Sequence, residues 1–331
     1  MTTNKRIVLA SRPQGAVQPE NFRIEEAPTS RPGEGEVLVR NEWLSLDPYM
    51  RGRMSDAKSY VKGVDIGEVM VGQTVGEVVE SAHPGFKPGD KVLTSTGWQQ
   101  YGVARGKELR MIDASRVPAS YYLGILGMPG LTAWFGLFEI GKAKAGETLV
   151  VSAASGAVGS VVGQLGKNKG MRVVGIAGGR EKCDYVVREL GFDACVDYKA
   201  GRLAEDLRAA CPEGIDVDFE NVGGEILDTV LRQMKFLGRV VVCGLIAEYN
   251  ATEPYGYKAM RSILVNRLRV QGMIVFDWKD RYEEALADLG ARVAGGKLRY
   301  RESIVEGLEN APRGLIELLA GKNFGKQLVK L

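Results

Sequence analysis

The chain has 331 residues, of which 45% are hydrophobic and 26% charged, an ordinary composition for a globular protein of about two domains. Its 44 lysines and arginines exceed its 41 aspartates and glutamates by three, so no basic field argues for a nucleic acid or an acidic membrane as partner. The apolar runs are far shorter than the roughly 20 residues of a membrane span and the N-terminus has too short an apolar core for a signal peptide, so we expect a cytoplasmic protein.

The first part of the chain, residues 1–125, is rich in short strands. Alternating apolar residues broken by Gly and Pro predict strands at 6–12, 36–43, 72–81 and 90–104, which indicates a β-rich module. The single histidine, His83, lies in a loop of this module beside a proline. The four cysteines are spread without a C-x-x-C pair, so we expect reduced thiols, no zinc site and no Ser-His-Asp triad unless His83 serves it.

In residues 126–298, strands alternate with helices. Strands are expected at 148–154, 171–177, 193–198, 215–223, 238–244 and 267–275, with helices such as 225–234 between them. This spacing predicts an α/β domain with a doubly wound parallel sheet. An amphipathic helix is expected at 282–294, and the last residues, KQLVKL, form a strand suited to return to the first module, which would then include 299–331.

Residues 148–170 carry a strand, a turn of small residues and a helix. Ala154, Gly156 and Gly159 occupy the places of the three glycines in the G-x-G-x-x-G pattern of dinucleotide-binding proteins. The helix that follows offers unpaired N–H groups and a positive dipole end to a pyrophosphate. An ordinary strand-to-helix turn has the same appearance, so the pattern alone does not decide.

The next strand, 171–177, ends without a carboxylate. In NAD-binding proteins an acidic residue at this place accepts from the ribose 2′-hydroxyl, whereas here Gly178 is followed by Arg180 and Lys182. Two cations and no carboxylate at this place favour NADP(H), which has a 2′-phosphate, over NAD, which has none. The alternative is a solvated basic start of a helix.

Several longer stretches together resemble one family, the zinc-independent medium-chain dehydrogenases/reductases. Within it the chain is most similar to leukotriene B4 12-hydroxydehydrogenases, alkenal double-bond reductases and curcumin reductases. The stretches that carry this resemblance are LSLDPYMRGRM (44–54), GMPGLTAWFGL (127–137), AASGAVGSVVGQ (153–164), LGFDACVDYK (190–199), GIDVDFENVGG (214–224), CGLIAEYN (243–250) and NFGKQLVKL (323–331). The resemblance implies a GroES-like β-rich catalytic domain and a Rossmann cofactor domain.

The resemblance also implies a set of NADP(H)-binding residues. For the pyrophosphate these are Gly156, Ala157, Val158 and Gly159, and for the adenosine 2′-phosphate Gly178, Lys182 and Tyr198. For the ribose and nicotinamide they are Asn221, Cys243, Gly244, Leu245, Ile246, Tyr249, Ile274, Val275, Phe276 and Asn323. Tyr198 as a surface residue at a strand end, and Asn221 as a turn former, are the ordinary alternatives.

The implied reaction is hydride transfer from NADPH to the β-carbon of a hydrophobic α,β-unsaturated ketone or aldehyde. Donors are then needed for the enolate oxygen and a proton for the α-carbon, and the candidate catalytic residues are Tyr249, Tyr60 and Tyr49. Some relatives have a tyrosine, proposed as the acid, where this chain has Val265, so here the proton would come from Tyr249, Tyr60, a water or the ribose hydroxyl. A quinone or carbonyl reductase, and a non-enzymatic protein that senses NADPH or binds nucleic acid, remain alternatives. A homodimer formed through the apolar strand at 267–275 is expected, with a tetramer as the other possibility.

Overall fold

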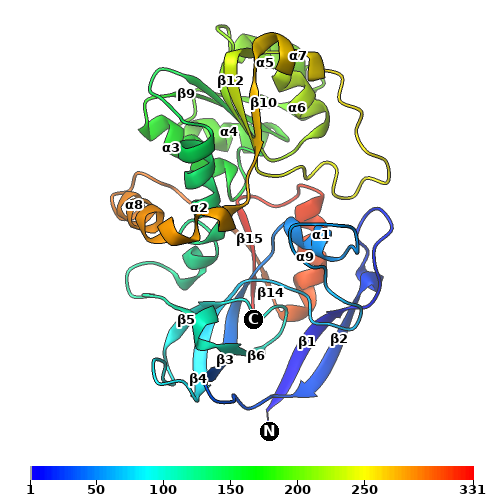
Figure 1. Ribbon diagram of the computed structural model, residues 1–331, viewed down its shortest axis with the longest axis vertical. Coiled ribbons are helices and arrows are strands. Elements are labelled where there is room, and N and C mark those ends of the chain that lie inside the picture. The colour runs from blue at the N-terminus through cyan, green and yellow to red at the C-terminus, as the bar shows by residue number, and fades with distance from the viewer. Residues whose placement is uncertain (1) are drawn as a thin grey trace. The chain divides into compact units, whose positions relative to one another are not determined.

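The computed structural model describes residues 2–331, which divide into two compact units (Figure 1). Unit 1 contains the residues up to Gly124 together with Glu302–Leu331, and unit 2 is Ile125–Arg301. The boundaries expected from the sequence fall at 125/126 and 298/299, and those of the compact units at 124/125 and 301/302.

Unit 1 is built mainly of strands. They are β1 (Thr3–Leu9), β2 (Phe22–Pro28), β3 (Glu36–Ser45), β4 (Thr74–Ser81), β5 (Lys91–Thr94), β6 (Tyr101–Arg105), β7 (Arg110–Met111), β14 (Glu302–Glu306) and β15 (Lys326–Lys330). Strands β1 and β2 form an antiparallel pair, and the others form a sheet of order β14-β15-β3-β4-β5-β7 in which β6 also pairs with β3. The expected return of the C-terminal strand is confirmed, because β15 pairs antiparallel with β3.

Two helices of unit 1, α1 (Tyr49–Arg53) and α9 (Ala311–Leu319), contribute to the same buried cluster as β1 and β15. Within it the rings of Phe22 and Trp98 stack with centroids 5.4 Å apart. The prediction of a single strand at 90–104 is wrong, because β5 and β6 are separate strands. Gly97 turns the chain between them with φ of +81°, and a Cβ there would lie 2.5 Å from the carbonyl oxygen of Met70.

Unit 2 contains the expected parallel sheet. Its strands are β8 (Thr148–Ser152), β9 (Arg172–Ala177), β10 (Ala194–Asp197), β11 (Ile215–Glu220), β12 (Met234–Val242) and β13 (Arg269–Gly272). They are parallel and ordered β10-β9-β8-β11-β12-β13. β8 is buried throughout its length because helices cover both faces of the sheet.

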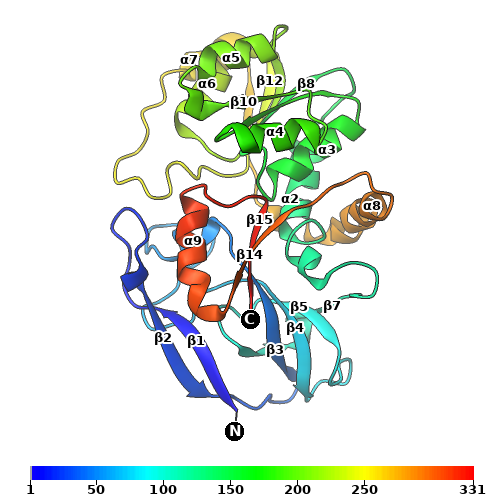
Figure 2. The ribbon, with the colours of Figure 1, turned by 180° about the vertical axis from the view of Figure 1, so that it is seen from behind.

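The helices of unit 2 gather on opposite faces of this sheet, α3 and α4 on one and α5, α6 and α7 on the other (Figures 1 and 2). They are α2 (Met128–Phe135), α3 (Gly159–Asn168), α4 (Arg180–Arg188), α5 (Leu203–Ala210), α6 (Gly224–Leu231), α7 (Met260–Asn266) and α8 (Tyr282–Ala294). The helix predicted at 282–294 is confirmed as α8. The strand predicted at 267–275 is too long, because the chain leaves the sheet after Gly272 and enters a 3-10 turn at Val275–Arg281.

No helix between residues 2 and 331 is long and apolar enough to cross a membrane.

Candidate functional site

The strands of unit 2 end along one edge of the sheet, and the loops that follow them form the candidate site. In open α/β sheets, ligands bind outside the carboxyl ends of the strands. We call this set of loops the carboxyl edge: 153–158 after β8, 178–179 after β9, 198–199 after β10, 221–223 after β11 and 243–249 after β12. Parallel pairing therefore brings together residues that are far apart in the sequence.

The turn between β8 and α3 depends on small residues. Ala153 has φ of +49°, and the N–H of Gly156 donates to the Ala153 carbonyl at 2.8 Å. A Cβ on Gly159 would lie 2.4 Å from that same carbonyl oxygen, so only glycine lets α3 begin this close to the strand. Gly156, Ala157 and Val158 are partly exposed just before α3, where the helix dipole favours an anion.

The ends of β9 and β10 contact each other. A Cβ on Gly178 would lie 2.9 Å from the Tyr198 side chain, so the tyrosine packs directly against the glycine. The Asp197 carboxylate accepts from the N–H groups of Gly179 at 2.8 Å and Lys199 at 3.0 Å. This carboxylate is therefore occupied in joining the two loops.

Two lysines lie next to this contact. Burial, and then the charge of Lys199, lower the pKa of Lys182 on α4. Lys199 Nζ lies 5.9 Å from the centroid of the Tyr198 ring. Two positive charges held close together repel each other, and a bound anion would offset that repulsion. Lys182, Tyr198 and Lys199 therefore fit a phosphate group. Arg180 differs, because its side chain is 90% exposed with Nε 3.8 Å from Asp184.

The turn after β11 is joined to the end of β8. Asn221 donates from its side chain to the Ser152 carbonyl at 2.8 Å and from its backbone to the Ser152 hydroxyl at 2.7 Å. Glu220, fully buried at the end of β11, accepts from the Ser152 hydroxyl and from the N–H groups of Val222 and Gly223. The Asn221 side chain thus links this turn to the carboxyl end of β8, the strand that precedes the glycine-containing turn of residues 153–158.

The loop after β12 rests on that turn. The N–H groups of Cys243 and Gly244 donate to the Glu220 carbonyl at 2.9 and 3.1 Å, and Ile246 donates to Asn221 at 3.2 Å. Burial raises the pKa of the Cys243 thiol to about 12, so this cysteine stays protonated at neutral pH.

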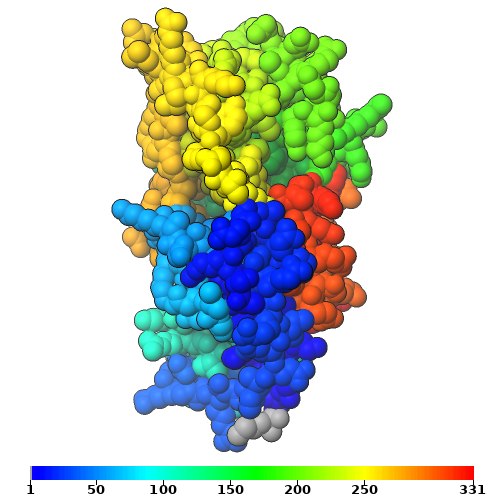
Figure 3. Space-filling model, turned by 90° about the vertical axis from the view of Figure 1, so that its right-hand side faces the viewer, coloured from blue at the N-terminus to red at the C-terminus, as the bar shows by residue number. Residues whose placement is uncertain are grey.

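Within this loop the Tyr249 hydroxyl accepts from the N–H of Leu245 at 3.3 Å, which folds the phenol back over its own loop. The chain then continues through exposed residues 251–254, in the yellow part of Figure 3.

Residues after β13 lie near the same edge of the sheet. The N–H of Met273 donates to the Val242 carbonyl at 3.0 Å, which brings Ile274 and buried Val275 beside the end of β12, while Phe276 is 44% exposed. Val265 lies elsewhere. It is 56% exposed on α7, which precedes β13 and therefore lies at the opposite, amino-terminal edge of the sheet.

The other expected residues belong to unit 1. Tyr49 is the first residue of α1, and burial followed by the charge of Asp47 raises its pKa. Tyr60 is 61% exposed. Asn323 donates from its side chain to the Gly325 carbonyl at 2.8 Å and so closes the turn before β15.

A buried ion pair holds the segment of Tyr49 to the C-terminal strand. Lys326 Nζ, 1% exposed, donates to Asp47 Oδ1 at 3.0 Å and to the carbonyl oxygens of Leu46 at 2.6 Å and Gln327 at 3.0 Å. With all three protons of the ammonium group donated, Lys326 fixes the entry into α1.

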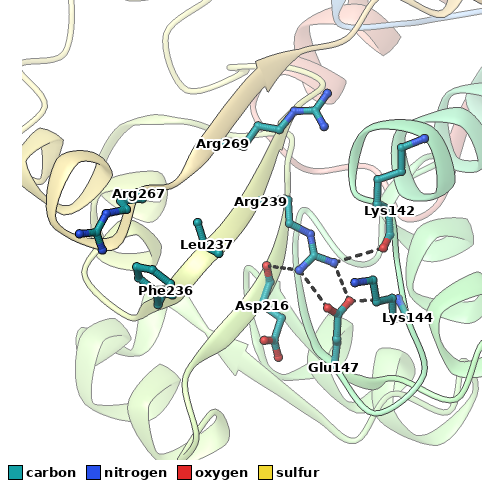
Figure 4. Close-up of a pocket in the computed structure, with 9 residues that line it drawn as sticks. All are labelled: Lys142, Lys144, Glu147, Asp216, Phe236, Leu237, Arg239, Arg267 and Arg269. Carbon is teal, nitrogen blue, oxygen red and sulfur yellow. Dashed lines mark hydrogen bonds and ion pairs between the residues drawn. The ribbon is translucent and has the colours of Figure 1, made fainter.

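A pocket of about 450 Å³ opens at the amino-terminal edge of the sheet of unit 2 (Figure 4). Both carboxylates that line it are paired with a cation. Arg239 donates to both carboxylate oxygens of Glu147, at 3.0 and 2.6 Å, and Asp216 pairs with Lys235 at 2.9 Å. Because it lies opposite the carboxyl edge, we do not assign the cofactor to this pocket.

Among residues 2–331, no group of three or more His, Cys, Asp or Glu side chains is placed to hold a metal ion.

Lys199, Asp197 and Glu220 were not anticipated as site residues. Lys199 directly follows Tyr198, so a second cation at the 2′-phosphate position was visible in the sequence. Glu220 has no such signal, because its role depends on Ser152, which lies 68 positions earlier.

The fold and the carboxyl edge define a class of protein, a Rossmann dinucleotide-binding unit joined in one chain to a GroES-like β unit. Family models agree with this division. One described as "N-terminal domain of oxidoreductase" matches residues 5–112, and one described as "Zinc-binding dehydrogenase" matches residues 157–291.

Known proteins resemble the chain over nearly its whole length. The NADPH-dependent curcumin reductase of Escherichia coli is 53% identical, over 99% of this chain and 97% of the relative. The NADP(+)-dependent 2-alkenal reductase of Nicotiana tabacum is 41% identical, over 99% and 98%. The crystal structure of CurA from Vibrio vulnificus in complex with NADPH superposes with a TM-score of 0.95 at 51% identity, covering 98% of each chain. The chain belongs to the medium-chain dehydrogenase/reductase family, in its zinc-independent subfamily of alkenal and curcumin reductases.

Proposed function

We propose that this protein uses NADPH to reduce the carbon–carbon double bond of α,β-unsaturated ketones and aldehydes. The observation that carries the choice of cofactor is the pair of cations, Lys182 and Lys199, beside Tyr198 at the carboxyl edge. The reaction is supported by the similarity to a curcumin reductase and a 2-alkenal reductase, since both named substrates contain a conjugated carbon–carbon double bond.

The residues at the carboxyl edge fit such a cofactor. Gly159 lets α3 begin close to Ala153, and a pyrophosphate at the start of that helix would contact Gly156, Ala157 and Val158 through their backbone. Gly178, Lys182 and Tyr198, with Lys199, would hold the 2′-phosphate. The ribose and nicotinamide would meet Asn221, the loop from Cys243 through Gly244, Leu245 and Ile246 to Tyr249, the segment Ile274, Val275 and Phe276, and Asn323.

When bound, NADPH supplies the hydride that the β-carbon of the substrate receives. Negative charge then moves to the carbonyl oxygen, and hydrogen-bond donors aimed at that oxygen lower the barrier. The phenols of Tyr49, Tyr60 and Tyr249 are the proposed donors for this oxygen and for the α-carbon. The raised pKa of Tyr49 keeps its phenol protonated at neutral pH, as a donor must be.

A product assay tests this function. The purified protein is incubated with NADPH and 4-phenyl-3-buten-2-one, and the product is identified by mass spectrometry. We expect the saturated ketone. Formation of the allylic alcohol alone would instead identify a carbonyl reductase, and turnover restricted to quinones a quinone reductase. No NADPH consumption across a panel of enones and quinones would favour the non-enzymatic alternative.

We further propose a homodimer formed through β13. This strand lies at one end of the sheet of unit 2, and Val270 on it is 41% exposed. Phe236, Leu237 and Leu264, on neighbouring segments, are 59%, 57% and 80% exposed. Edge strands with apolar surroundings favour pairing with another chain. Light scattering after size exclusion should give twice the 36.0 kDa chain mass, and Val270→Lys should give the monomer.

The cytoplasm is the compartment that we propose. Cys183, Cys195, Cys211 and Cys243 are all free thiols in the structure, which suits a reducing environment.

A further inference from the structure

Strand β11 ends with two fully buried carboxyl groups, Asp218 and Glu220, in different surroundings. Neither oxygen of Asp218 has a hydrogen-bond partner among the described residues, and its register neighbours Val150 and Val240 belong to a buried apolar cluster. Burial and the charge of Glu220 raise the pKa of Asp218 well above its ordinary value. Asp218 is therefore the neutral member of the pair.

Glu220 is instead bound by the turn that follows it. Its Oε1 accepts from the Ser152 hydroxyl at 2.5 Å, from Val222 N–H at 2.5 Å and from Gly223 N–H at 3.0 Å. The same hydroxyl accepts from the N–H of Asn221 at 2.7 Å. Burial raises the pKa of Glu220, these hydrogen bonds oppose the rise, and its other oxygen, Oε2, has no hydrogen-bond partner among the described residues. Glu220 thus orients the peptide N–H groups of Val222 and Gly223 directly, and that of Asn221 through the Ser152 hydroxyl.

This turn in turn supports the loop after β12. The N–H groups of Ile246 and Ala247 donate to the carbonyl oxygens of Asn221 and Val222, at 3.2 and 2.9 Å. At the far end of the turn, Gly224 N–H donates to the Tyr257 hydroxyl at 3.2 Å. A shift of the turn therefore shifts the loop that carries Tyr249.

We propose that Glu220 is a positioning residue for the nicotinamide half of the cofactor. This inference rests on the proposed function, in which the turn and the loop line the nicotinamide and its ribose. The adenosine half is assigned to Lys182, Tyr198 and Lys199, which follow other strands. Loss of Glu220 should therefore weaken binding of the whole cofactor and leave binding of its adenosine half unchanged.

The test compares two ligands by isothermal titration calorimetry on the full chain. NADPH contains both halves, and adenosine 2′,5′-bisphosphate contains only the adenosine half. Glu220→Ala removes the acceptor of all three bonds, and Ser152→Ala removes one donor together with the acceptor of Asn221 N–H. Glu220→Gln keeps an acceptor oxygen, and Asp218→Asn is the matched control on the same strand.

We expect Glu220→Ala and Ser152→Ala to raise the Kd for NADPH about tenfold, equivalent to about 1.4 kcal/mol. The Kd for the bisphosphate should change less than about twofold, and Glu220→Gln and Asp218→Asn should stay within about threefold of wild type for both ligands. If Glu220→Ala does not fold, Ser152→Ala alone provides the test, with the same changes expected in the Kd for NADPH and for the bisphosphate.

Two results would overturn the inference. Equal weakening of both ligands would show a general structural role, and unchanged affinity for NADPH in both Ala variants would show no role. Wild-type protein that binds neither ligand would refute the proposed cofactor site itself, and the role of Glu220 with it.

Discussion

Lys182→Met tests the assignment of the 2′-phosphate. Methionine keeps the apolar stem of the side chain and removes only the charge. A charge-assisted hydrogen bond contributes about 1.5–3 kcal/mol, and because Lys182 is only partly buried, solvent screening places it at the low end. Since about 1.4 kcal/mol corresponds to a factor of ten, the KM for NADPH should rise about tenfold. The KM for NADH, which lacks the phosphate, should not change.

Lys182→Met should also affect the thermal stability of the protein without cofactor. Lys182 faces the charge of Lys199, so its removal relieves repulsion and the Tm should stay equal or rise. Steady-state kinetics with a saturating enone and thermal unfolding measure the two effects. Arg180→Met is the matched control, because Arg180 lies on the same helix, is exposed and pairs with Asp184. Equal changes in KM for NADPH and NADH, or an equal effect of Arg180→Met, would refute the assignment.

Three further substitutions test stability and the glycine turn. Asp218→Val should raise the Tm more at pH 9 than at pH 5. The pKa of Asp218 is raised in the folded state, so the stability that its protonated form contributes is fully present below about pH 3.8, the ordinary pKa of an aspartate. That stability is lost as the pH rises through the pKa of Asp218 in the folded protein, and valine has no such loss. A lower Tm for this variant at pH 9 would contradict that account. Lys326→Met should lower the unfolding free energy by about 3–5 kcal/mol, because Asp47 is left buried without its cation, and adding Asp47→Asn should restore part of the loss in denaturant titrations. If the losses in unfolding free energy from Lys326→Met and Asp47→Asn simply add in the double variant, that would argue against an ion pair between the two residues. Gly159→Ala should weaken NADPH binding measured by calorimetry, because the added Cβ would lie 2.4 Å from the Ala153 carbonyl oxygen and would displace the start of α3. Unchanged affinity would show that the turn does not contact the cofactor.

Local patterns predicted most of the elements that hold the candidate site. The buried runs at β8 and β9 and the amphipathic helix α8 have clear periodicities, and the apolar pattern of the last residues predicts the strand β15, whose pairing with β3 is seen only in the structure. The break between β5 and β6 was missed because it depends on the close approach of Gly97 to Met70, a contact between distant residues.

The chemistry of the site was less accessible from the sequence. The cations near Gly178 suggested a phosphate, but the use of Asp197 as a backbone acceptor appears only when β9 and β10 are paired. Glu220 reads as an ordinary residue of a strand until β11 lies beside β8 and brings Ser152 to it. Interactions across the sheet therefore determine which carboxylates are available, and no local pattern reports them.

The most direct test of the central claim follows the hydride. NADPH deuterated at C4 of the nicotinamide, on the face that the protein uses, is supplied with an enone, and the product is analysed by NMR and mass spectrometry. The account predicts a saturated ketone or aldehyde with deuterium at the β-carbon. Deuterium at the carbonyl carbon of an alcohol, with the double bond intact, would contradict it.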